Sequence, residues 1–150
     1  MILLPQGTNK INADHIERNI GISKEYNNFE LTKALGQKNV LKANRIIRYM
    51  GDNQKTHPMV LTMTILYGYF SKLMAYHFIT DKSRNNVASM LGIKPFGVTE
   101  YELAAKKYTP AKLAQIISYL KEYDLKSKGI GGSSATEGEM LSELIYKILH

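Results

Sequence analysis

The chain has 150 residues, no cysteine and a formal net charge of +7. Without cysteine it can hold neither disulfides nor thiolate metal sites, and this composition suits a reducing compartment, so we expect a cytoplasmic protein. The positive charge favours polyanions in general. Because basic residues occur singly or in pairs rather than in one block, a dedicated nucleic-acid site is the less favoured interpretation.

Apolar residues recur at helical spacing along most of the chain, and no strand pattern or fixed-period repeat is found. The sequence therefore predicts an all-α fold, a single helical bundle of about seven to eight helices. In chain order, these helices are expected at about 12–20, 27–36, 39–51, 58–79, 83–92, 99–107, 110–129 and 140–149.

Several helix ends carry recognisable signals. Asn39 is expected to cap the third helix, and Thr109 followed by Pro110 opens the seventh. Thr99 with Glu102 fits a capping box at the start of the sixth helix. Pro95 predicts an extended segment just before it, because the proline ring disfavours helical angles at the preceding residue.

Segment 58–79 has the length of a membrane-spanning helix, but Lys72 lies inside it and a lysine is costly in lipid. We therefore expect a long, mostly buried helix of a bundle, and no membrane partner. Gly68 within it predicts a closely packed neighbouring helix. Its core side is expected to consist of Leu61, Ile65, Leu66, Tyr69, Leu73 and Tyr76.

The seventh helix places Asp124 on its apolar side, four residues after Leu120. A carboxylate in that position needs a partner, and Lys128 lies one turn further on. The sequence therefore predicts a structural ion pair between Asp124 and Lys128 that is at least partly buried.

No catalytic or metal-binding pattern is found. The Gly/Ser-rich segment 129–138 lacks the lysine that a phosphate-binding loop requires, so it is interpreted as a flexible connection. The four histidines have no ligand spacing, and no nucleophile elbow of the G-x-S-x-G type is present. We expect no enzymatic activity and no cofactor, and an enzyme is the third-ranked hypothesis.

A nucleic-acid-binding interpretation remains open. Lys42, Arg45 and Arg48 share one face of the helix after a turn near residues 36–39, as in a helix-turn-helix. That helix has few of the side chains that read bases, and such a turn is common between any two helices. A free-standing helical nucleic-acid-binding protein is the alternative from a different class.

The last helix carries a narrow apolar stripe behind the flexible segment, so it can pack on the chain's own core or on a neighbouring protein. Tyrosines with a polar tip suit the rim of such a contact. The sequence does not decide between the chain's own core and a neighbouring protein as the surface that this helix covers. The candidate subunit interface consists of Tyr119, Tyr123, Leu141, Leu144, Ile145 and Ile148, with Lys126 and Lys128 at its rim.

Four features occur together in the second half of the chain: the run LGIKPFGV, the pair Ala104-Ala105, Tyr108, and the ending D-x-x-x-K-G at 124–129, before an apolar last helix. In this order and spacing the chain resembles the C-terminal domain of the bacterial DNA polymerase III delta subunit, a clamp-loader component, in a Bacteroidetes-like version. The resemblance is densest from Asn85 onward.

The resemblance implies that residues 1–25 are the tail end of a preceding middle domain and its linker, and that 26–150 form the helical collar domain. Collar domains join loader subunits, so the expected partners are the tau/gamma and delta-prime subunits. The sliding clamp would be bound only through an N-terminal domain missing from this chain. Primer-template DNA would be met through the assembled polymerase holoenzyme, with Lys126 and Lys128 as candidate DNA-proximal residues. The alternative within this class is the collar domain of tau/gamma or delta-prime itself.

Overall fold

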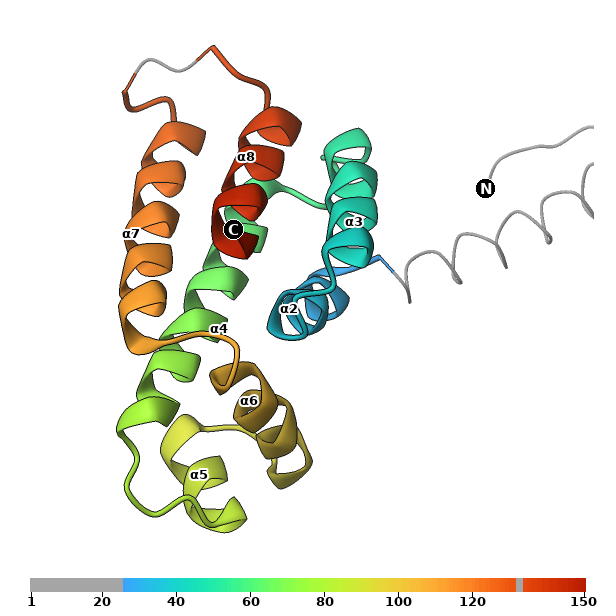
Figure 1. The fold of residues 1–150 in the computed structure, drawn as a ribbon. Helices are drawn as coiled ribbons and strands as arrows, with labels where there is room; N and C mark the ends of the chain where they lie inside the picture. Colours follow the sequence, from blue (N-terminus) through green and yellow to red (C-terminus); the bar gives the residue numbers. More distant parts are fainter. Residues whose placement is uncertain (1–25, 132–133) are drawn as a thin grey trace, which may run out of the picture.

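The computed structural model describes residues 26–131 and 134–150, and this part of the chain is helical throughout, without strands (Figure 1). The helix predicted at 12–20, and the segment 1–25 assigned to a preceding domain, lie outside it. The elements are α2 (Asn28–Gly36), α3 (Val40–Asp52), α4 (Met59–Phe78), α5 (Arg84–Leu91), a 3-10 turn η1 (Pro95–Gly97), α6 (Val98–Ala105), α7 (Pro110–Ser127) and α8 (Glu137–Leu149).

Helix α4 is the long central element of the bundle. It packs along α7 on one side and against α6 and α2 on another, while α8 lies between α7 and α3 (Figure 1). Helix α5 and η1 close one end of the molecule against α4 and α6. The all-α prediction is confirmed.

Most predicted helix starts are correct. The side chains of Asn39 and Thr109 accept hydrogen bonds from backbone N–H groups in the first turns of α3 and α7. The capping box at Thr99 is wrong, because η1 runs directly into α6 and that helix begins one residue earlier, at Val98. The Thr99 hydroxyl instead accepts a hydrogen bond of 3.3 Å from Arg84.

Helix α8 begins at Glu137, earlier than predicted, because Thr136 caps it by accepting a hydrogen bond from the backbone N–H of Glu139 at 3.1 Å.

Gly138 in the first turn of α8 and Gly51 near the end of α3 have a packing role that the sequence does not reveal. A Cβ added to Gly51 of α3 would lie 3.2 Å from Cα of Gly138. The absence of a side chain at both positions therefore lets α3 and α8 approach closely.

The predicted core side of α4 is partly wrong. Leu66, Leu73 and Tyr76 are buried as expected, but Leu61 is 50% exposed. The buried side of α4 is rotated from the predicted one, and its centre is formed by Met59, Thr62, Met63, Leu66, Phe70 and Leu73.

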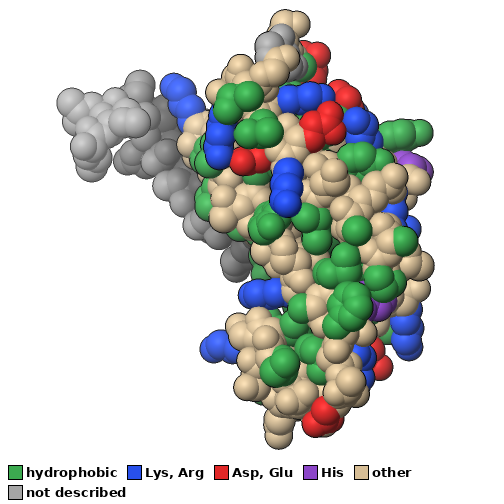
Figure 2. Space-filling model, turned by 90° about the vertical axis from the view of Figure 1, so that its left-hand side faces the viewer, with side chains coloured by type: hydrophobic (Ala, Val, Ile, Leu, Met, Phe, Trp, Pro, Cys, Tyr) green, Lys and Arg blue, Asp and Glu red, His purple; other side chains and the backbone are tan. Residues whose placement is uncertain are grey.

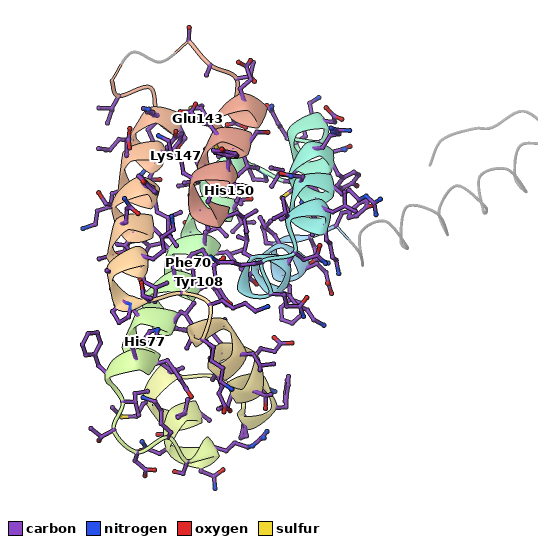
Figure 3. All side chains as sticks on the ribbon, in the orientation of Figure 1. Phe70, His77, Tyr108, Glu143, Lys147 and His150 are labelled. Atoms are coloured by element: carbon purple, nitrogen blue, oxygen red, sulfur yellow. The ribbon has the colours of Figure 1, made fainter. Side chains whose placement is uncertain are left out.

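Tyr108 holds the loop between α6 and α7 in place (Figure 3). The residue is fully buried, its ring lies edge-on to Phe70 of α4, and its hydroxyl donates a hydrogen bond of 2.6 Å to the carbonyl oxygen of Leu35. Its own carbonyl oxygen lies 2.7 Å from Nε2 of His77. Burial raises the pKa of Tyr108 far above its ordinary value, so the hydroxyl stays protonated and donating.

We expect Tyr108→Phe to lower the free energy of unfolding by about 1 kcal/mol, since it removes one buried hydrogen bond while Leu35 keeps a backbone donor. Tyr108→Ala should cost roughly 3–5 kcal/mol, because it also opens a cavity beside Phe70. Urea denaturation measures both changes. Tyr146→Phe, at an exposed tyrosine of α8, is the control and should change stability by less than about 0.5 kcal/mol. An equal effect of Tyr108→Phe and Tyr146→Phe would contradict the proposed anchoring.

Candidate protein-interaction site

The apolar stripe of the last helix is part of the chain's own core. Its four side chains are at most 4% exposed, packed between α7 and α3, so they are not available to another protein. This corrects the expectation that Leu141, Leu144, Ile145 and Ile148 form a subunit interface. An amphipathic helix buries its stripe on the nearest apolar surface, and here α3 and α7 supply one.

Tyr123 of that candidate set is also fully buried, and its hydroxyl is bonded to the exposed carboxylate of Glu143 on α8. It donates a hydrogen bond of 2.5 Å to Oε1 of Glu143, and the Lys147 ammonium lies 3.7 Å from the same oxygen (Figure 3). The Tyr123 hydroxyl, and then Lys147, hold the pKa of Glu143 below its ordinary value. Burial, with Glu143 beside it, raises the pKa of Tyr123. This group joins α7 to α8.

The remaining rim residues are engaged within the chain. Lys126 pairs with Glu122 at 3.1 Å and lies 4.7 Å from the centre of the Tyr123 ring. Tyr119 is half-buried, with the Lys147 ammonium 5.5 Å from its ring centre. Glu122 and Lys126 near the end of α7 therefore each have a partner of opposite sign. On the face seen in Figure 2, charged side chains of both signs gather at this end.

Asp124 and Lys128 form an ion pair of 3.0 Å at the end of α7. Their side chains are 37% and 52% exposed, so the pair lies at the edge of the core rather than inside it. Exposed pairs of this kind are screened by solvent and contribute roughly 0.2–1 kcal/mol.

Several other lysines bind backbone carbonyls at helix C-termini, where the helix dipole is negative. The Lys107 ammonium donates to the Gln37 carbonyl at the end of α2 at 2.8 Å, and that of Lys112 donates to the Lys147 carbonyl in α8 at 3.1 Å. Lys82 does the same at the end of α4. Part of the net positive charge thus has a structural role inside the fold.

One apolar surface without a partner among the described residues is the outward side of α4, which sequence reasoning missed. We call it the α4 outer face. It runs along the whole helix, over about 27 Å at the usual helical rise. It contains no Asp, Glu or Arg, although its large side chains are 44–72% exposed. Its residues are Val60, Leu61, Thr64, Tyr67, Gly68, Ala75 and Phe78.

Gly68 in the middle of this face has no close neighbour. A Cβ added there would meet no atom of another element of the described chain within 4 Å, so the predicted close-packed helix is not part of it. Glycine inside a helix costs about 1 kcal/mol relative to alanine. The signal in the sequence is that apolar residues occur all around α4, with Lys72 as its only Lys, Arg, Asp or Glu, which is unusual for a helix at the surface of a bundle.

The described residues include no group of three or more His, Asp or Glu side chains that is placed to bind a metal ion. No helix among them is long and apolar enough to cross a membrane. What the described residues present is an all-helical bundle in which one long helix face carries no Asp, Glu or Arg.

Comparison with known proteins gives the particular family. The family described as DNA polymerase III delta subunit, C-terminal domain, matches residues 25–146. The chain therefore belongs to this family, and its role is related to the clamp loader of DNA replication. No curated protein and no solved structure gives a significant match.

We expect Asp124→Asn and Lys128→Gln each to lower the free energy of unfolding by less than about 1 kcal/mol, because both side chains are solvated. In the double variant the free energy of unfolding should fall by no more than in the more affected single variant, since both single changes remove the same ion pair. Urea denaturation in low and high salt measures this. A loss of several kcal/mol from either single change would instead indicate a buried charge left without its partner.

Tyr123→Phe should raise the pKa of Glu143 toward its ordinary value of 4.5, because it removes the hydroxyl that stabilises the carboxylate. In the native chain this stabilisation is present above pH 4.5 and is lost as the pH falls through the lowered folded value. NMR titration of the Glu143 side chain measures the shift. Tyr119→Phe is the control and should leave this pKa unchanged; equal effects of the two variants would exclude the hydroxyl as its cause.

Proposed function

We propose that this chain is the collar domain of a clamp-loader delta subunit: a non-catalytic oligomerisation domain that packs sideways against other loader subunits and so supports loading of the sliding clamp onto primed DNA. The partners are the tau/gamma and delta-prime subunits, in the cytoplasm. The observation that carries the proposal is the α4 outer face, which is long, uncharged and exposed in a chain of this family.

A partner protein fits this face better than nucleic acid does. Binding to phosphates needs Lys or Arg, and α4 contributes only Lys72, near the edge of the face. Burial of exposed apolar side chains stabilises a protein–protein contact by about 25 cal/mol per Å² of apolar surface. Because stable interfaces usually bury about 1,200–2,000 Å² in total, one helix face supports assembly best when several subunits join.

Two further parts of the proposal concern other contacts of the loader. Contact with the sliding clamp is assigned to a domain outside this chain. Contact with primer-template DNA is assigned to the assembled complex, where Lys126 and Lys128 at the end of α7 are the candidate residues. Both lysines hold exposed ion pairs in the chain, and such weak pairs are readily exchanged for phosphates.

The purified chain should co-elute in size-exclusion chromatography with the tau/gamma or delta-prime subunit of its own organism, and should bind duplex DNA only weakly at 150 mM salt. The experiment mixes the chain with each subunit at micromolar concentration and measures DNA binding separately over a range of salt concentrations. If the chain binds neither subunit but binds duplex DNA tightly, it acts as a nucleic-acid-binding protein and the collar proposal fails.

A further inference from the structure

We propose that the α4 outer face binds one α-helix of a partner protein, which crosses α4 at Gly68. This inference rests on the proposed function, and it adds the kind of element that docks and the point where it docks. Three independent features of the described chain support it: the open glycine, two hollows beside the helix, and the distribution of charge.

Gly68 gives a second helix room for close approach. It lies near the midpoint of α4, it is flanked on the same face by Thr64 and Tyr67, and a Cβ there would point into open space. Helices that pack at short interaxial distance need small side chains at the crossing point. No contact within the described chain requires a glycine at position 68, so we assign the requirement to contact with a partner protein.

Two hollows border the face on either side of that crossing point. One, of about 320 Å³, lies between α4 and α7, and its lining includes Thr64 and Tyr67 of α4 with Lys121 and Asp124 of α7. The other, of about 470 Å³, lies between the end of α4 and α5, and its lining includes Ala75, Phe78, the exposed Met90 and Asp81. Thr64 and Ala75 are eleven residues apart, which is roughly 16 Å along the helix. A docking helix with large apolar side chains about three turns apart would fill both hollows.

The charges favour a different protein over a second copy of this chain. Lys72 is half-buried at the edge of the face, and none of the described residues forms an ion pair with it. Because α4 itself contains no Asp or Glu, a second α4 packed on this face would offer Lys72 no carboxylate. The expected partner helix therefore carries a carboxylate beside its apolar stripe.

The test uses the full 150-residue chain with two variants, and the tau/gamma and delta-prime subunits as probes. Gly68→Ala should raise the midpoint of thermal unfolding by about 2–4 °C, since alanine favours the helix and meets no clash in the free chain. It should nevertheless weaken binding to the partner subunit about tenfold, because the added methyl group separates the two helices. A variant that is more stable but binds more weakly cannot be explained by misfolding.

Leu61→Asp should weaken binding at least tenfold by placing a charge on the apolar face. Leu41→Asp is its matched control, because Leu41 is also an exposed leucine (62%, against 50% for Leu61) in the first turn of its helix, α3, on a different side of the bundle. It should leave the affinity unchanged. If the wild-type chain binds a loader subunit and both α4 variants bind as tightly, the helix-docking inference is overturned while the proposed function stands. If the wild-type chain binds neither subunit, both fail.

A photo-crosslinking amino acid at Ala75 identifies the occupant. Crosslinks to a helical peptide of the partner subunit, located by mass spectrometry, are the expected result. Crosslinks only to a second copy of the chain, or only to residues 1–25 of the same chain, would overturn the proposal of a partner helix.

Discussion

Tyr108 sets the position of α7, and most of the bundle depends on that position. The residue lies in the reversal between α6 and α7, far from α2 in sequence, yet its hydroxyl bonds to the Leu35 carbonyl and its ring packs on Phe70. Because α7 lies along α4, and α8 packs on α7, this one anchor connects both ends of the described chain. A buried hydroxyl must be paired, so the geometry tolerates little variation.

Close helix contacts in this fold are made where side chains are absent. Gly51 and Gly138 allow α3 and α8 to touch through their backbones, and a Cβ on Gly36 would collide with the Tyr69 hydroxyl. Gly68 is the same kind of residue without an internal neighbour. The similarity of Gly68 to these three glycines is why we propose an intermolecular contact at Gly68.

Many of the lysines have structural roles within the described chain. Lysines at the ends of α2, α4 and α8 bind terminal carbonyls, and those at the end of α7 pair with acids one turn away. These lysines offset the negative ends of helix dipoles and neutralise neighbouring carboxylates, and they do not form a basic groove. The long face without carboxylates on α4 has no role of this kind within the described chain, and it is the face for which we propose a role in assembly.

The sequence by itself determined the all-helical fold, nearly every helix and the caps at Asn39 and Thr109, because period and capping are local properties. It also carried the family resemblance, which the match over residues 25–146 confirms. Only the tertiary structure decided which sides of the helices are buried. Leu61 and Leu66 belong to the same apolar helix, and nothing local distinguishes the exposed one from the buried one. Leu141 and Ile148 likewise suit a partner or a core equally well, and they entered the core because α3 and α7 lie within reach.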